Sequence, residues 1–280
     1  MKRVMTEIGA AARLDLGEVL RSRWLVFATS IYALLAGALV IAGMRESNVL
    51  GFTGMGRIQL SFVHVLLMVL PLLALSATTQ IVNRARDDGT IELLFSHPLS
   101  RGSYLTAMTL TRYLVLLLPL VVLLAAMAAG AKLVFGETVP WAMTLRSMAV
   151  SAALLWAFVG LGLAVSVHVR NQAKAVVWGM LLWALGVALL DLALVGLLLQ
   201  WRVEPHALFV LSSLNPVQAA RLALLSGVEP DLGTLGPVGF HLWNRVGADA
   251  LLYLGLAWPL AVGTGGWAWA MRTFRRGDLV

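Results

Sequence analysis

Few side chains in this sequence combine a reactive type with a position where they could do chemistry. Asp191 is the one acidic residue well inside a long apolar run, and an acid in such a place is a candidate functional residue by default. It follows Lys174 by 17 residues, which is about 25 Å along a helix. We therefore expect Asp191 near the far end of that run, where a structural role, capping or pairing with Arg202 or Arg245, competes with a functional one.

A second set of candidate residues has the ligand types that soft metals bind. His64 is expected at a similar depth to Asp191, and Met68 lies in the same apolar run as His64. Several other residues of these two types are expected in the same half of the molecule: His206, His241, Met44, Met55, Met127, Met143 and Met148. A pathway for a soft metal along His64, Met68 and Asp191 is one interpretation. The other is that the methionines fill gaps in an apolar core.

The sequence lacks the common catalytic and nucleotide-binding motifs. None of its three lysines follows a Gly-rich loop and precedes Ser or Thr, so no Walker A motif is present. Neither His-Glu-x-x-His nor Gly-x-Ser-x-Gly occurs. The absence of cysteine excludes disulfides and thiolate ligands. We therefore expect a chain that is not an enzyme and binds no cofactor of its own.

The composition is that of an integral membrane protein. Of the 280 residues, 60% are hydrophobic and 12% are charged, whereas about a quarter of the residues in a soluble domain carry a charge. The net charge of +7 comes from residues spread along the chain rather than gathered in one patch, which argues against a nucleic-acid partner. No linker or repeat divides the chain, and we expect residues 1–280 to form a single domain.

Intervals free of charge predict six transmembrane helices. Each is close to the ~20 residues that a helix needs to cross a lipid bilayer, and every backbone polar group in lipid must be paired internally. The predicted fold is therefore all-α and polytopic. The predicted spans are residues 24–44, 60–82, 113–131, 147–167, 175–199 and 250–271.

The basic residues predict the orientation of these spans. Six spans place both termini on one side, and 14 of the 21 Lys and Arg residues fall on that side, against seven on the other. Cytoplasmic loops carry the excess of positive charge. Both termini and residues 84–101 are therefore expected in the cytoplasm, and residues 200–249 form an extracytoplasmic segment.

Two amphipathic stretches flank or interrupt this pattern. In residues 1–23, an apolar helix face opposes charged residues, which is typical of a helix lying in the membrane interface; the apolar face holds Met5, Ile8, Ala12, Leu16 and Val19, and the charged residues are Glu7, Arg13, Asp15 and Glu18. In the outer segment, Asn215 is a candidate N-cap, Pro216 suits the first helical position and Gly227 can end the helix.

Residues 84–101 predict a short helix between the second and third spans. Asp87 and Asp88 offer N-cap oxygens, and Pro98 ends the helix because it fixes φ and has no N–H to donate. A helix of roughly two turns is too short to be stable alone in water. It must therefore pack against something.

The spacing of apolar residues in this helix predicts a docking face. Ile91, Leu94 and Phe95 share one side, with Glu92 and Ser96 on the other. Such a face on a bridge between two spans could enter a groove of a partner and receive mechanical force. The alternative is a membrane-surface helix that only connects its neighbours.

The motif in this stretch resembles the coupling helix of type-2 (exporter-class) ABC transporter permeases. The resemblance is carried by Gly89-Thr90-Ile91-Glu92-Leu93-Leu94 and His97-Pro98-Leu99-Ser100-Arg101. It implies a homodimer driven by two cytoplasmic ATPase subunits, which bind the ATP and Mg. It also implies an ATPase-coupling role for a defined set of residues: Asp88, Gly89, Thr90, Ile91, Glu92, Leu94, Phe95, Pro98 and Arg101.

Within that family, further segments resemble the permeases that serve copper-site maturation of nitrous oxide reductase. They are Arg21-Ser22-Arg23-Trp24-Leu25, Leu50-Gly51-Phe52-Thr53, Asp191-Leu192 and Leu214-Asn215-Pro216. This resemblance implies the bacterial inner membrane, copper or sulfur chemistry, and a periplasmic copper-handling partner. Two alternatives stay open: an exporter of a lipid, drug or other small hydrophobic compound, and an ATP-independent carrier or channel.

Overall fold

A computed structural model describes residues 2–21, 23–50, 55–135, 141–189, 213–227 and 247–276. Every regular element in these ranges is a helix, as the sequence predicted. They are α1 (Lys2–Arg21), α2 (Trp24–Leu50), α3 (Met55–Thr78), α4 (Ile81–Asp87), α5 (Thr90–Phe95), α6 (Arg101–Phe135), α7 (Trp141–His168), α8 (Gln172–Ala184), the π-helix η1 (Leu185–Leu189), α11 (Pro216–Leu225) and α13 (Ala248–Arg276).

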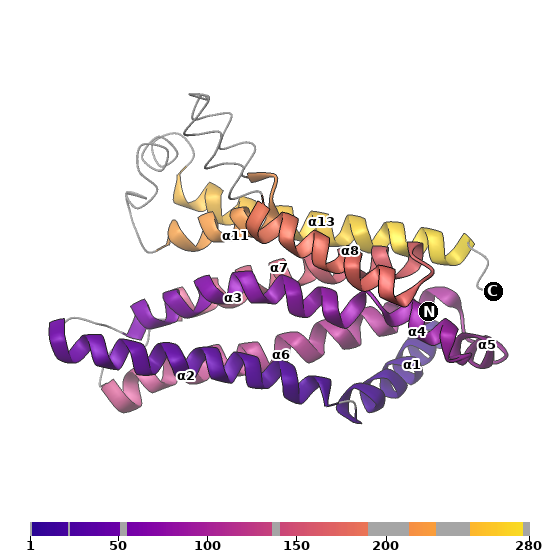
Figure 1. Cartoon of the computed structure of the whole chain (residues 1–280), viewed down its shortest axis with the longest axis horizontal. Coiled ribbons are helices and arrows are strands. Elements are labelled where there is room, and N and C mark those ends of the chain that lie inside the picture. The colour runs from indigo at the N-terminus through magenta and orange to yellow at the C-terminus, as the bar shows by residue number, and fades with distance from the viewer. Residues whose placement is uncertain are drawn as a thin grey trace.

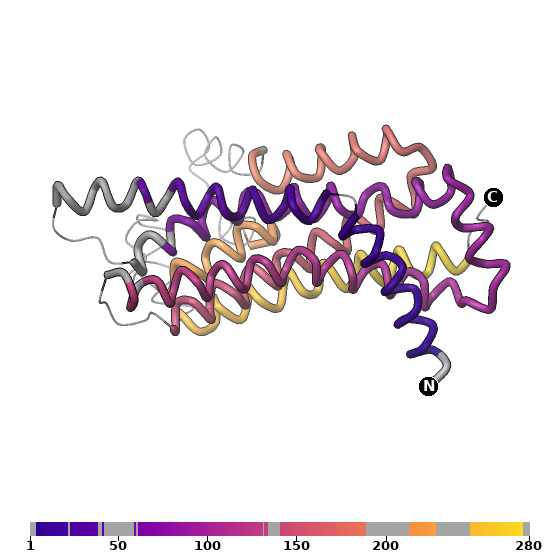
Figure 2. The backbone as a smooth tube through the Cα atoms, turned by 90° about the horizontal axis from the view of Figure 1, so that it is seen from below, coloured from indigo at the N-terminus to yellow at the C-terminus, as the bar shows by residue number. Residues whose placement is uncertain are grey.

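The long helices run roughly side by side, and the start of α1 and the end of α13 lie at the same end of the bundle (Figures 1 and 2). The short helices α4 and α5 form a corner at that end, between α3 and α6 (Figure 1). Helix α1 crosses the bundle there, turned by 63° from the first part of α2. Arg23, at the bend, has a positive φ of 57°. The interfacial position of α1 stays a prediction.

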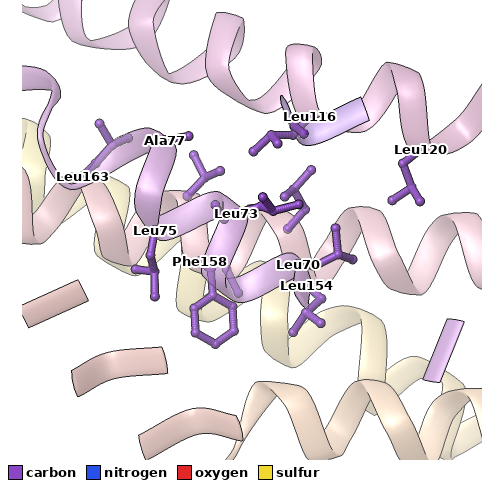
Figure 3. Packing of buried hydrophobic residues seen from close by; sticks show 14 of the residues in the cluster. Leu70, Leu73, Leu75, Ala77, Leu116, Leu120, Leu154, Phe158 and Leu163 are labelled. Atoms are coloured by element: carbon purple, nitrogen blue, oxygen red, sulfur yellow. The ribbon is translucent and has the colours of Figure 1, made fainter. Parts of the chain in front are cut away.

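The core is built from leucines on three of the long helices. Leu70 and Leu73 of α3 meet Leu116 of α6, and Leu154 and Phe158 of α7 close the cluster (Figure 3). All five side chains are buried. This interior contact defines one face of each helix, while the opposite faces carry exposed apolar residues, such as Leu118 and Val122 on α6.

Helices α7 and α13 pack with their backbones in direct contact, because glycines leave no side chains between them. Their contact is lined by Gly160, Gly263 and Gly266. A Cβ atom added at Gly263 would lie 2.5 Å from the carbonyl oxygen of Trp156, and one at Gly266 would lie 2.9 Å from that of Gly160. Small residues let helix backbones touch in this way inside membranes. We call this contact the glycine seam.

Four of the six predicted spans coincide with helices that are long and apolar enough to cross a membrane: Ser61–Asp87, Arg101–Gly130, Trp141–His168 and Ala248–Arg276. At the predicted first span the bent pair of α1 and α2 could count as a fifth. At the predicted fifth span only the shorter apolar helix Gln172–Ala188 is described. Asp191 and most of the outer segment lie outside the described residues. The count of six stays a prediction.

The described part of the outer segment begins as its sequence predicted. Asn215 caps α11, because its side-chain oxygen accepts a hydrogen bond from Val217 N at 3.0 Å. Pro216 is the first helical residue, and Gly227 N donates to Leu224 O as the helix ends. Helix α11 packs against α7 and α13, and its apolar residues from Leu222 to Leu225 are buried.

Candidate coupling site

The corner formed by α4 and α5 is attached to the bundle at its first helix. The backbone N–H of Val82 donates to Ser166 Oγ of α7 at 2.9 Å. Gln172, at the start of α8, donates from Nε2 to Gln80 Oε1 at 2.9 Å. Helix α4 is thus held by the ends of two helices that follow it in the chain by more than 80 residues.

The predicted N-cap of the short helix is wrong. Asp87 is the last residue of α4, and Asp88 is its C-cap, with its N–H bonded to Arg84 O at 2.9 Å. The residue preceding α5 is Gly89, whose φ of 67° is left-handed. It has no side chain that could cap the helix. Apolar residues upstream extend the helical run to Asp87, and a glycine able to adopt positive φ separates the two helices.

The orientation of α5 corrects the predicted docking face. Ile91 is only 3% exposed, and Leu94 and Phe95 are half-buried. All three pack against the hydrophobic core of this chain. The exposed apolar side chain of α5 is Leu93, at 67%. The face with the expected spacing therefore attaches the corner to its own bundle, and Glu92 and Leu93 face away from it.

An aromatic cluster fixes the inner face of α5. The ring of Phe95 lies 5.8 Å from that of Tyr104 in an edge-to-face arrangement and 6.3 Å from that of Phe274. Tyr104 and Phe274 stack with their centroids 6.0 Å apart. Each ring comes from a different helix, α5, α6 or α13. Aromatic pairs of this kind contribute about 0.5–1.5 kcal/mol beyond their buried area, so α5 is coupled to two long helices at once.

The exit from α5 agrees with the predicted stop. The helix ends at Phe95 with Ser96 as C-cap, and Pro98 follows in the turn. Ser100 caps the next helix, α6, since its Oγ accepts a hydrogen bond from Ser103 N at 3.1 Å. Arg101 donates from Nη1 to the carbonyl oxygen of Arg275 at 3.3 Å. This predicted site residue therefore joins the start of α6 to the end of α13.

Helix α1 adds contacts that the sequence did not indicate. Glu7 Oε2 accepts hydrogen bonds from Ser100 N at 3.2 Å and from Ser103 Oγ at 3.0 Å. Asp15, expected on the exposed polar side, is 2% exposed and pairs with Arg112 of α6 at 2.6 Å. Desolvation by burial raises the pKa of Asp15 to about 6, although the charge of Arg112 acts to lower it.

The predicted outer pathway is only partly within the described residues. His64 is half-buried on α3, and Met68, on the same helix, is 43% exposed. The carbonyl oxygen of Met68 accepts a hydrogen bond from Trp183 Nε1 at 2.9 Å, which ties α3 to α8. Asp191 is outside the described residues. Within the described ranges, no group of three or more His, Asp or Glu side chains could hold a metal ion.

The structure thus gathers most of the predicted coupling residues at one corner. Tyr104 and Phe274 contact Phe95 there, and Glu7 bonds to Ser100 beside Arg101. The pair of Asp15 and Arg112 lies further along the contact between α1 and α6. The stripe of Ala11, Asp15 and Val19, spaced by four residues, could have indicated that Asp15 is buried. No local signal identifies Phe274, because its partners are more than 150 residues away in the sequence.

Comparison with known proteins gives matches along nearly the whole chain. Residues 10–262 match the family described as ABC-2 family transporter protein. The chain is similar to the probable ABC transporter permease protein NosY of Stutzerimonas stutzeri, with 30% identity over 260 residues, covering 91% of this chain and 94% of that protein. It is also similar to the protein of the same name from Pseudomonas aeruginosa, with 31% identity over 271 residues, covering 92% and 98%.

Proposed function

Because this chain belongs to the ABC-2 family of transporter proteins, we propose that its α4–α5 corner receives the movement of a separate ATPase and passes it to the membrane-spanning helices. Permease subunits of this family are non-catalytic, and the ATPase activity lies in a partner. The observation that supports the corner as the contact is its attachment: α5 is anchored by Phe95 to both α6 and α13, while Leu93 is exposed.

Two properties of the corner suit it to transmit force. Phe95 of α5 packs against α6 and α13, and α4 is hydrogen-bonded to α7, so a displacement of the corner moves these helices rather than a loose loop. Its outer face offers Leu93 beside Glu92, and an apolar side chain of this size contributes about 1.5–3 kcal/mol when fully buried. An exposed ion pair of Glu92 with a basic residue of the groove would add no more than about 1 kcal/mol.

The proposed assembly is a homodimer with two ATPase subunits in the cytoplasm of a bacterium, with both termini of this chain on the cytoplasmic side of the inner membrane. A single chain without an internal repeat provides no two-fold surface of its own for a pair of ATPase subunits. The proposed role is in the copper or sulfur chemistry of nitrous oxide reductase maturation, with a periplasmic copper-handling protein as a further partner. Support comes from the similarity to the two NosY proteins.

The experiment is a charge placed on the outer face of α5. Leu93→Asp should abolish co-purification of the ATPase, or leave its ATP hydrolysis uncoupled from maturation, while membrane insertion stays normal. Leu93→Met keeps the apolar surface and is the matched control, and Glu92→Ala should be much milder. Normal ATPase recovery and normal reductase maturation in Leu93→Asp would show that the corner is not the contact.

The substrate assignment has a separate test. A strain lacking this chain should make nitrous oxide reductase with an incomplete copper site, and the wild-type chain should restore the copper content. Restoration by Leu93→Met and not by Leu93→Asp would link the site to that role. Full copper loading in the deletion strain would remove the assignment and leave an exporter of another compound.

A further inference from the structure

Helix α4 carries buried polar atoms that the coupling contacts do not use. Asn83 of α4 is fully buried, and neither of its side-chain polar atoms has a hydrogen-bond partner within the described residues. One turn later, Arg86 has its Nε and Nη1 buried, likewise without a partner there. Residues three apart share a helix face, so these donors lie together on α4.

A second guanidinium reinforces the positive charge at this place. Arg170, in the turn between α7 and α8, lies close enough for its charge to repel that of Arg86, although the carboxylate of Asp87 acts in the opposite sense. The turn is held against α4 by the hydrogen bond between Gln172 and Gln80. Two like charges in a partly desolvated place are unfavourable, and buried donors without acceptors add a further cost. An anion with several oxygens would offset both.

We propose that Asn83, Arg86 and Arg170 bind the phosphate group of an anionic phospholipid. A phosphate accepts parallel hydrogen bonds from guanidinium groups and can bridge two of them. The carboxamide N–H of Asn83 supplies a further donor. The proposal rests on the position of the chain in a membrane and does not depend on the ATPase contact.

The surroundings favour a lipid over a soluble anion. Arg86 is close to the end of the candidate span Ser61–Asp87, which places it at the level of the headgroups. Beyond Arg170, the outward side of α8 is apolar, with Trp178, Met180 and Leu181 each more than half exposed. Acyl chains can lie along this surface while the headgroup contacts the two arginines. Basic pockets between helices at a membrane boundary are known lipid headgroup sites.

The test compares three additives on the purified full-length chain in a mild detergent: phosphatidylglycerol, phosphatidylcholine with the same acyl chains, and inorganic phosphate. Because a ligand that binds only the folded state raises the unfolding temperature with concentration, phosphatidylglycerol should raise it and the other two should not. Arg86→Gln and Arg170→Gln should each weaken the apparent affinity for phosphatidylglycerol roughly tenfold or more, from the loss of a charged hydrogen bond.

Arg84→Gln is the matched control, since Arg84 is an exposed arginine on the same helix and should keep the wild-type response. Arg170 is itself exposed, so Arg170→Gln tests the site even if Arg86→Gln fails to fold. An equal response to both phospholipids, or a full response to inorganic phosphate alone, would overturn the proposal. So would an unchanged response in the double variant that carries Arg86→Gln and Arg170→Gln together. So would a double variant that responds normally to lipid but loses the ATPase or the dimer, which would assign the arginines to a protein carboxylate.

Discussion

The contact between α1 and α6 and the contact between α7 and α13 hold their helices together by opposite means. The first is polar: Asp15 pairs with Arg112, and Glu7 accepts from Ser100 and Ser103. The second is the glycine seam, in which backbone atoms touch directly. A contact made by a few polar side chains can be loosened by one displaced partner. A backbone contact cannot slide without separating the helices.

The corner lies where the two kinds of contact meet. Phe95 of α5 touches Tyr104 of α6 and Phe274 of α13, so α5 presses on one helix from each pair. A movement of the corner would pass through α13 to α7 as a rigid unit, whereas the attachment of α1 can adjust. The glycine seam is therefore expected to be rigid, and the α1 contact is expected to be adjustable.

The largest effect is expected from leaving Asp15 without its cation. Arg112→Met should lower the free energy of unfolding by about 3–5 kcal/mol, the usual cost of an uncompensated buried charge. The double variant Asp15→Leu with Arg112→Met removes both charges and should be close to wild type. Thermal unfolding of the purified chain in detergent at neutral pH measures both. Equal losses in the two variants would show that packing, not charge, holds α1.

The same pair predicts a dependence of stability on pH. Because burial raises the pKa of Asp15 from 3.8 to about 6, the folded chain binds this proton more tightly than the unfolded chain does. The stabilisation is complete below about pH 4 and is lost as the pH rises through about 6. In Arg112→Met the lowering effect of the cation is removed, so the loss should move to higher pH. An unchanged profile would show that the Asp15 carboxyl does not sense Arg112.

The glycine seam should respond to a single methyl group. Gly263→Ala should lower the free energy of unfolding by about 1–3 kcal/mol, because the added Cβ has no room beside Trp156 and the helices must separate. Gly265 is on the same helix with nothing within 4 Å of an added Cβ. Gly265→Ala should therefore be neutral or slightly stabilising, as alanine is the better helix former. Similar unfolding temperatures for both variants would contradict the close contact.

The sequence predicted what depends on local periodicity and missed what depends on distant partners. Long apolar intervals predicted helices at the four spans that meet the length and hydropathy criteria, and the capping signals of Asn215 and Pro216 gave the start of α11. The caps at Asp87 and Asp88 failed because the helix before them continues further than the charge pattern indicates. Capping preference alone does not distinguish the first residue of one helix from the last of another.

The docking face failed for a different reason. Ile91, Leu94 and Phe95 do share a face, but periodicity reports only that a face is buried and not which molecule covers it. In this chain, Tyr104 and Phe274 cover it. The single exposed leucine beside it, Leu93, breaks the amphipathic pattern. A residue that departs from the pattern was therefore more informative about a partner than those that fit it.

The smallest effect is expected at the second polar attachment of α1. Glu7→Gln keeps an oxygen for Ser100 N and Ser103 Oγ but removes a negative charge from the start of α6, where it interacts favourably with the helix dipole. This should lower the free energy of unfolding by about 0.3–1 kcal/mol.

Glu7→Ala also removes the two hydrogen bonds, and it should lower the free energy of unfolding by about 0.5–1.5 kcal/mol more for each bond that was fully formed. Arg13→Gln, at an exposed residue of the same helix, is the control. If α1 is an adjustable attachment, Glu7→Ala should increase hydrogen exchange in α1 and at Ser100 while leaving α7 and α13 protected as in the wild type. Increased exchange along the glycine seam would mean that the two contacts act as one unit, and the distinction between them would be lost.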